Sequence, residues 1–141
     1  MASQTAIALN GFIALALFLI ILMELLRSRL VFLKQIRINE FKPDNSNLSL
    51  FMQRLARAHA NCIEGLPIFG GLLLVALVAE QTAITDPLAY PLLAARFVQS
   101  SAHLASLSIL AVNIRAAAFA IQMAIGAYLA IRLLAVLAGG G

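Results

Sequence analysis

The stretch AIALNGFIALALFLIILM, residues 6–23, decides the fold class of this chain. It is 18 residues long and contains one polar side chain, Asn10, and no charged one. A helix needs about 20 mostly apolar residues to cross the hydrocarbon core of a bilayer. The stretch is too long for the apolar core of a typical cleaved signal peptide, and no basic residue precedes it. It therefore predicts a retained transmembrane helix.

The rest of the chain has the same character, with 62% hydrophobic and 11% charged residues and a mean hydropathy of +0.97. An average soluble domain is about one quarter charged. The length of 141 residues predicts one membrane domain, 1–141. The net charge of +4 comes from basic residues at helix ends and within apolar segments, so no nucleic-acid partner is expected. The single cysteine, Cys62, excludes an intrachain disulfide.

Hydrophobic segments predict an all-α integral membrane protein with four transmembrane helices, at about 6–37, 50–79, 87–112 and 114–138. The purely apolar part of the second helix, 65–79, has 15 residues and is too short to span ~30 Å at 1.5 Å per residue. The charged first half of that helix must therefore lie partly at membrane depth. Short connections predict an up-down-up-down bundle.

Basic residues predict the orientation of the bundle. One side carries Arg27, Arg29, Lys34, Arg37, Lys42, Arg54, Arg57 and Arg115. The other side carries Glu80, Asp86 and Arg132, the last as a snorkelling residue. The positive-inside rule then places both termini on the non-cytoplasmic side of the membrane. Without a sorting signal, a bacterial inner membrane or an organelle membrane is expected.

A polar arc lies on the second predicted helix. Arg54, Arg57, Asn61 and Glu64 are spaced i, i+3, i+7 and i+10 and fall within about 80° of each other on a helical wheel. His59 points away from this arc. Such groups cannot face lipid. They form either an interhelical ion-pair network that holds the bundle or an oligomer together, or an anion site, in which arginine forks bind carboxylates and the glutamate accepts from an ammonium group.

The two later helices add polar groups. One face of the third helix carries Arg96, Gln99, Ser100 and His103, and the fourth helix begins with Arg115, followed on the same face by Phe119 and Gln122. His103 is either a packed, hydrogen-bonded histidine or part of the site. Arg115 is either a positive-inside anchor or a ligand-binding residue. Glu24 either pairs with an arginine or marks a proton-coupled site.

Motifs for other chemistries are missing from the sequence, which has no HExxH, CxxC, GxSxG or phosphate-binding glycine loop. With two histidines and one cysteine, no metal site is expected.

The run Arg57-Ala58-His59-Ala60-Asn61-Cys62-Ile63-Glu64, followed by Pro67 and Phe69, resembles the signature of the MAPEG family, the membrane-associated proteins of eicosanoid and glutathione metabolism. The run 113–119, with Arg132-Leu133-Leu134 beyond it, looks like helix 4 of the microsomal glutathione transferases. The resemblance covers nearly the whole chain and suggests a bacterial member of the family.

The resemblance implies a homotrimer that binds glutathione as co-substrate between neighbouring subunits, near the cytoplasmic side. Carried over by position, Arg57, Asn61 and Glu64 hold the glutathione carboxylates and amine. Arg54, Arg96, His103 and a basic residue after the first helix, Arg27 or Arg29, complete the binding site. Arg115 is the catalytic residue, nearest the sulfur. The implied activity transfers glutathione to hydrophobic electrophiles or reduces lipid hydroperoxides that enter from the membrane lipids.

Three positions depart from the family pattern: His103 and Phe119 replace tyrosines, and Ala116 replaces a serine. The segment between His103 and Arg115 is also about three residues longer than in typical members. These departures leave a second interpretation open, a non-catalytic member that binds a ligand or partner proteins. A third interpretation is a small proton-coupled transporter that uses Glu24.

Overall fold

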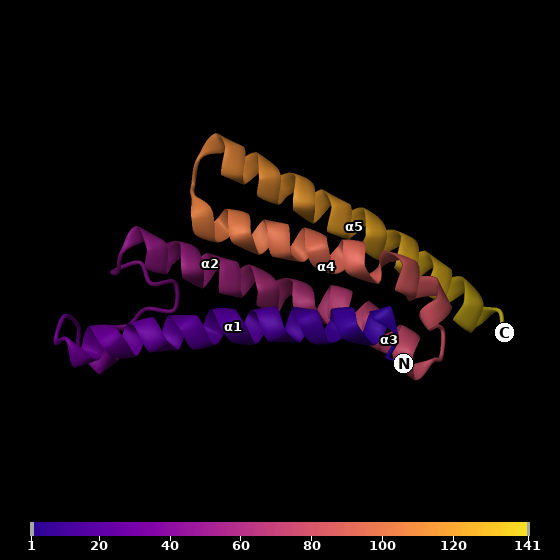
Figure 1. Cartoon of the computed structure of the whole chain (residues 1–141), viewed down its shortest axis with the longest axis horizontal. Helices are drawn as coiled ribbons and strands as arrows, with labels where there is room; N and C mark the ends of the chain where they lie inside the picture. The colour runs from indigo at the N-terminus through magenta and orange to yellow at the C-terminus, as the bar shows by residue number, and fades with distance from the viewer. Residues whose placement is uncertain (1, 141) are drawn as a thin grey trace.

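The computed structural model describes residues 2–140, and every regular element in that range is helical, as predicted. The elements are α1 (Gln4–Phe32), the 3-10 turn η1 (Ile38–Glu40), α2 (Leu50–Gly65), the π-helical turn η2 (Leu66–Gly70), α3 (Gly71–Val78), α4 (Thr82–Ala105) and α5 (Ile109–Ala138). Because η2 continues directly from α2 into α3, these three elements form one rod, so the chain folds into four rods (Figure 1).

The rods alternate in direction, and both chain ends lie at the same end of the bundle (Figure 1). Helix α4 contacts α1, α2, α3 and α5, so it is the central helix, whereas α5 packs chiefly on α4. One core cluster joins α1 to α2 and includes Leu19, Leu55 and Cys62. A second joins α1 to η2, α3 and α4 and includes Phe12 and Phe69.

Three rods are long and apolar enough to cross a membrane: Gln4–Phe32, Leu50–Val78 and Ile109–Ala138. Large apolar side chains on these rods remain exposed, including Phe18, Leu25 and Leu134. A surface of this kind is suited to acyl chains and not to water. The chain is therefore an integral membrane protein, and lipid replaces water as the solvent of the bundle surface.

Helix α4 is less apolar than these three rods, because it carries polar residues on its inward face. Thr85, Arg96, Gln99 and Ser100 are all buried, and the first of these donates to the Thr82 carbonyl. Polar residues at membrane depth face the bundle interior, so low hydropathy in a central helix reflects burial within protein.

The first connection begins earlier than predicted. The predicted helix 6–37 is wrong at its end, because α1 ends at Phe32 and Lys34 adopts a left-handed φ of 57°. The connection is then fixed by Asn45, which is fully buried. Its Oδ1 accepts from Nε and Nη2 of Arg27 at 3.1 and 2.6 Å, and its Nδ2 donates to the Met52 carbonyl at 2.8 Å. This residue thus ties the end of α1 to the start of α2.

The third predicted helix, 87–112, is wrong at both ends. Helix α4 begins at Thr82, with Pro87 inside it, and membrane helices tolerate prolines of this kind. It ends at Ala105, and the chain turns at 106–108 and not near 113. Ser108 caps α5, since its hydroxyl oxygen accepts from the Ala111 N–H at 3.2 Å. Arg115 therefore lies in the second turn of α5.

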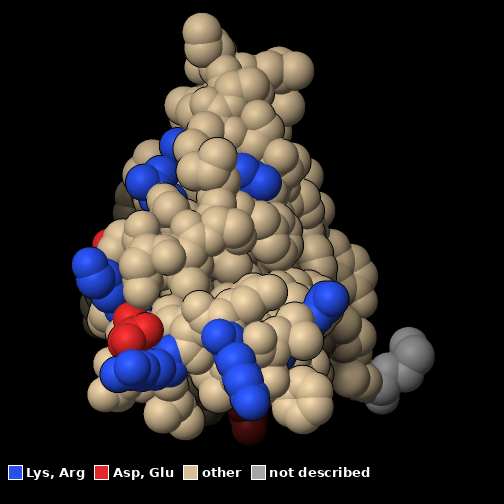
Figure 2. All heavy atoms as spheres, turned by 90° about the vertical axis from the view of Figure 1, so that its left-hand side faces the viewer, with Lys and Arg blue, Asp and Glu red and all other residues tan. Residues whose placement is uncertain are grey.

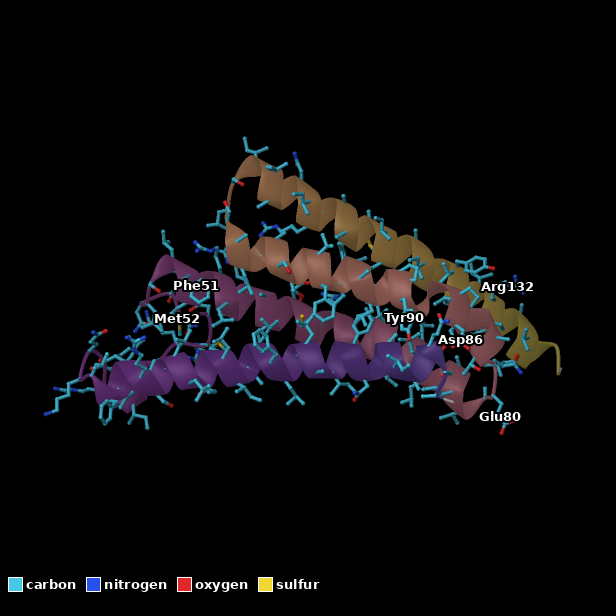
Figure 3. All side chains as sticks on the ribbon, in the orientation of Figure 1. Phe51, Met52, Glu80, Asp86, Tyr90 and Arg132 are labelled. Atoms are coloured by element: carbon cyan, nitrogen blue, oxygen red, sulfur yellow. The ribbon has the colours of Figure 1, made fainter. Side chains whose placement is uncertain are left out.

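The two ends of the bundle differ in charge. Lysine and arginine side chains dominate the end that carries the α1–α2 connection (Figure 2). Phe51 and Met52 lie toward that end, whereas Glu80, Asp86 and Arg132 lie at the opposite one (Figure 3). This is the separation of charge that the sequence predicted.

Candidate ligand-binding site

Arg96, in the middle of α4, is the most deeply buried charged side chain described, with 1% of its surface exposed. Its Nη1 donates to the Asn61 side-chain Oδ1 at 2.6 Å and to the Asn61 carbonyl at 3.3 Å. Its guanidinium carbon lies 6.0 and 5.8 Å from the ring centroids of Phe12 and Phe69. A cation over aromatic rings is attracted by their negative faces, which offsets part of the cost of burial.

Two nitrogens of Arg96, Nε and Nη2, are buried without a hydrogen-bond partner among residues 2–140. Buried polar groups are nearly always satisfied, so unpaired donors on a cation point to a functional role. The guanidinium fits here because residue 65 is glycine, since a Cβ at that position would lie 2.1 Å from Nη2.

The rod beside Arg96 changes its helical form at the same level. The π-helical turn η2 contains Pro67, which has no N–H for the helical ladder. π-Bulges of this kind are frequent at functional sites. Phe69, within the turn, lies against Gly126 of α5, where a Cβ would be 2.9 Å from Cε1 of the ring. This turn was not predicted from the sequence, although Gly65 and Gly70, on the two sides of Pro67, were a visible signal.

A groove of about 800 Å³ opens between the α2–η2–α3 rod and α5, with Arg96 at its base. We call it the α2–α5 groove. Its polar lining residues are Asn61, Glu64 and Arg96, and its apolar lining includes Pro67, Ile68, Val75, Phe119, Met123, Ala127 and Ala130. Because the polar residues of the rod come before the apolar ones, the groove is polar toward the basic end of the bundle. It can hold a molecule with a charged head and an apolar body.

Arg115 and His103 meet near that basic end. Nη1 of Arg115 lies 3.2 Å from Nδ1 of His103. Arg54, in the second turn of α2, donates from Nε to the Leu104 carbonyl at 3.0 Å. That carbonyl belongs to the last turn of α4, where the helix dipole favours a cation. Three predicted site residues are thus gathered around the C-terminal end of α4.

Two glutamines form a buried link between α4 and α5. Nε2 of Gln122 donates to Oε1 of Gln99 at 2.7 Å and to the Ala118 carbonyl at 3.1 Å. Cys62 of α2 lies 3.2 Å from the Ser100 hydroxyl. The polar face predicted for α4 is therefore a set of contacts to α2 and to α5.

The other two members of the predicted arc, Arg57 and Glu64, are exposed on the surface of the single chain. The described residues contain two ion pairs, Arg27–Glu24 at 3.1 Å and Arg37–Glu40 at 3.8 Å, and neither includes a residue of the arc. The arc is therefore not an ion-pair network within the chain. Glu24 pairs with an arginine, which was one of its two predicted roles.

Two further arginines lie apart from this site. Arg29 lines a separate cavity of about 640 Å³ between the end of α1 and the start of α2. Arg132 donates to the Tyr128 hydroxyl at 3.1 Å, at the opposite end of the bundle. The structure thus does not bring Arg29 together with Arg115 within one chain. Among residues 2–140, no three histidine, cysteine or carboxylate side chains gather as metal ligands.

The fold and the site define an all-α membrane protein whose buried arginine lies at the base of a groove that is polar at one end. The sequence comparison identifies the family: the MAPEG family model matches residues 8–135, so the chain belongs to the MAPEG family. Comparison with curated proteins and with solved structures gave no match.

Proposed function

We propose that this chain is a glutathione-binding membrane enzyme that transfers glutathione to hydrophobic electrophiles or reduces lipid hydroperoxides. The observation that carries the proposal is the α2–α5 groove, which in a MAPEG-family chain joins a polar end at Asn61, Glu64 and Arg96 to an apolar body. Glutathione has two carboxylates and an ammonium group, so this mixed set of side chains suits it. A hydrophobic second substrate suits the apolar body.

Arg57 and Glu64 take part in binding from the exposed side of α2. Unpaired charges at membrane depth cost several kcal/mol, so an exposed arginine and glutamate on this rod require partners outside the single chain. A homotrimer with glutathione between its subunits supplies them, and it also allows Arg29 of one subunit to approach the site of the next. Both termini then lie on the non-cytoplasmic side, with the basic end in the cytoplasm.

Arg115 acts on the sulfur. A free thiol has a pKa of ~8.5, so only a few per cent is thiolate at neutral pH. A guanidinium beside the sulfur stabilises the thiolate and lowers that pKa, and the released proton passes to water.

Two reactions follow from this thiolate. With an electrophile, sulfur bonds to the electrophilic carbon and the leaving group departs with its bonding electrons. With a hydroperoxide, sulfur bonds to the terminal oxygen as the O–O bond breaks, and the departing alkoxide takes a proton from water to become an alcohol. A second glutathione then converts the sulfenic product into glutathione disulfide and water.

The test is calorimetric titration of the purified protein with glutathione, followed by turnover with a chlorodinitroarene and with a lipid hydroperoxide. We expect binding and turnover, and loss of turnover in Arg115→Ala. Absence of both binding and turnover in the wild type would refute the proposal.

A second candidate function is a MAPEG-fold protein that binds glutathione or a partner without catalysis. Ala116 and Phe119 favour it, because neither offers a hydroxyl beside Arg115. Binding without turnover on either substrate class would support this alternative.

A further inference from the structure

The contact between Arg115 and His103 crosses the connection between the last two helices. His103 lies in the last turn of α4 and Arg115 in the second turn of α5, with the turn 106–108 between them. The two nitrogens, Nη1 of Arg115 and Nδ1 of His103, are 3.2 Å apart. His103 is half-buried, and so is Arg115.

The chemistry of the two groups fixes the tautomer of the histidine. A guanidinium has only N–H donors and keeps its charge in proteins. Nδ1 must therefore present its lone pair to Arg115. A neutral imidazole with an unprotonated Nδ1 carries its proton on Nε2. In this arrangement the ring has no free lone pair, so His103 cannot take the proton of a thiol while it holds Arg115.

Among residues 2–140, the contact with His103 is the side-chain hydrogen bond that the guanidinium of Arg115 makes. Neither ion pair within residues 2–140 includes Arg115. An arginine side chain has high conformational entropy, and a hydrogen bond at its head restricts the direction of the planar guanidinium. Two other arginines also donate to neutral acceptors: Arg54 donates to the Leu104 carbonyl and Arg96 to the Asn61 side chain. Neutral acceptors orient these cations without neutralising their charge.

We propose, on the basis of the function proposed above, that His103 is the positioning residue of Arg115. Its Nδ1 holds the guanidinium in the direction that stabilises the glutathione thiolate, and it does not act as the base. Ala116 and Phe119 carry no hydroxyl that could hold Arg115 in its place.

Three variants test the role, because asparagine and glutamine imitate different ring nitrogens. In His103→Asn the amide oxygen can occupy the place of Nδ1, whereas in His103→Gln the amide reaches the place of Nε2. His103→Ala removes both. His59→Asn is the matched control, since His59 is also half-buried but lies on α2 outside the site.

The measurements are the ultraviolet thiolate absorbance of bound glutathione, its affinity by calorimetry, and kcat with a chlorodinitroarene. We expect His103→Ala and His103→Gln to lose about tenfold in thiolate fraction and kcat, as for one hydrogen bond to a charged group. His103→Asn should recover most of both, while affinity changes little throughout. Equal impairment of His103→Asn and His103→Ala, or no impairment in His103→Ala, would overturn the inference.

Nitrogen NMR of the glutathione-free protein separates this inference from the proposed function. The wild type should show His103 with an unprotonated Nδ1 and a protonated Nε2, and His59→Asn assigns the second histidine signal. A protonated Nδ1 at His103 would overturn the positioning role even if glutathione binds. Failure to bind glutathione, with the expected tautomer present, would instead count against the proposed function alone.

Discussion

Nη1 of Arg96 donates to Oδ1 of Asn61 across 2.6 Å, and this bond joins the centre of α4 to the α2 face at the base of the groove. Both residues were predicted as site residues on two different helices, but the contact between them was not predicted. Since Nε and Nη2 of Arg96 have no partner among residues 2–140, Asn61 is the one side chain in that range that accepts a hydrogen bond from this buried cation.

Replacing Asn61 should therefore destabilise the bundle. Asn61→Leu leaves Arg96 as a buried charge without a side-chain acceptor, and we expect a loss of about 1.5–3 kcal/mol in the free energy of unfolding, as for a hydrogen bond to a charged group. Arg96→Met in the same background should cost much less than it does alone, because the unpaired charge is then gone. Denaturant unfolding in detergent of the two single variants and the double variant measures this coupling. Additive losses would contradict it.

Gly65 leaves space for the same guanidinium, so a larger residue at this position should destabilise the protein. In Gly65→Ala the new Cβ meets Nη2 of Arg96 at 2.1 Å, so the guanidinium must leave its position. We expect a loss of about 1–3 kcal/mol in stability, as for other overpacking changes, and weaker glutathione binding. Thermal unfolding and calorimetry measure the two effects.

The matched control is Gly71→Ala, six residues further along the same rod. A Cβ there meets nothing within 4 Å, and alanine is favoured over glycine in a helix by about 0.5–1 kcal/mol. This variant should be as stable as the wild type or more so. Equal losses of stability in Gly65→Ala and Gly71→Ala would show that the two glycines are needed for the helix itself and not for the placement of Arg96.

The helix count, the polar face of α4 and the charge separation were all readable from the sequence, because hydropathy and positive charge report directly on the solvent around each segment. The end of α4 could not be predicted from the sequence. Ala, Leu, Ser, Ile and Val continue without a break from 104 to 112, so composition gave no boundary, and the cap at Ser108 decided it. That shift places Arg115 within reach of His103.

The partners of the arc could not be derived from a helical wheel. The wheel groups Arg54, Arg57, Asn61 and Glu64 by angle, but it carries no information on neighbouring rods. In the structure Arg54 and Asn61 turn toward α4, whereas Arg57 and Glu64 remain exposed. Which side chains pair is a tertiary property, and the pairing outside the chain is still a prediction.

Arg57 and Glu64 should each contribute to glutathione affinity. We expect Arg57→Ala and Glu64→Ala to weaken binding by about 1.5–3 kcal/mol, the usual loss for a hydrogen bond to a charged group. Calorimetric titration with glutathione measures it. His59→Ala, outside the arc, should alter folding or assembly more than affinity. Equal affinity in all three variants would contradict the assignment of the arc to the ligand.

The apolar body of the groove should select the second substrate. Ala130 lines the groove on α5, so Ala130→Phe narrows the apolar part without touching Asn61, Glu64 or Arg96. We expect kcat/KM for a long-chain hydroperoxide to fall about tenfold or more, within the range that apolar pocket contacts contribute, while glutathione affinity is unchanged. Ala124→Phe is the control, since Ala124 is exposed on α5 and does not line the groove. Equal effects of the two variants on kcat/KM would mean that the substrate enters elsewhere.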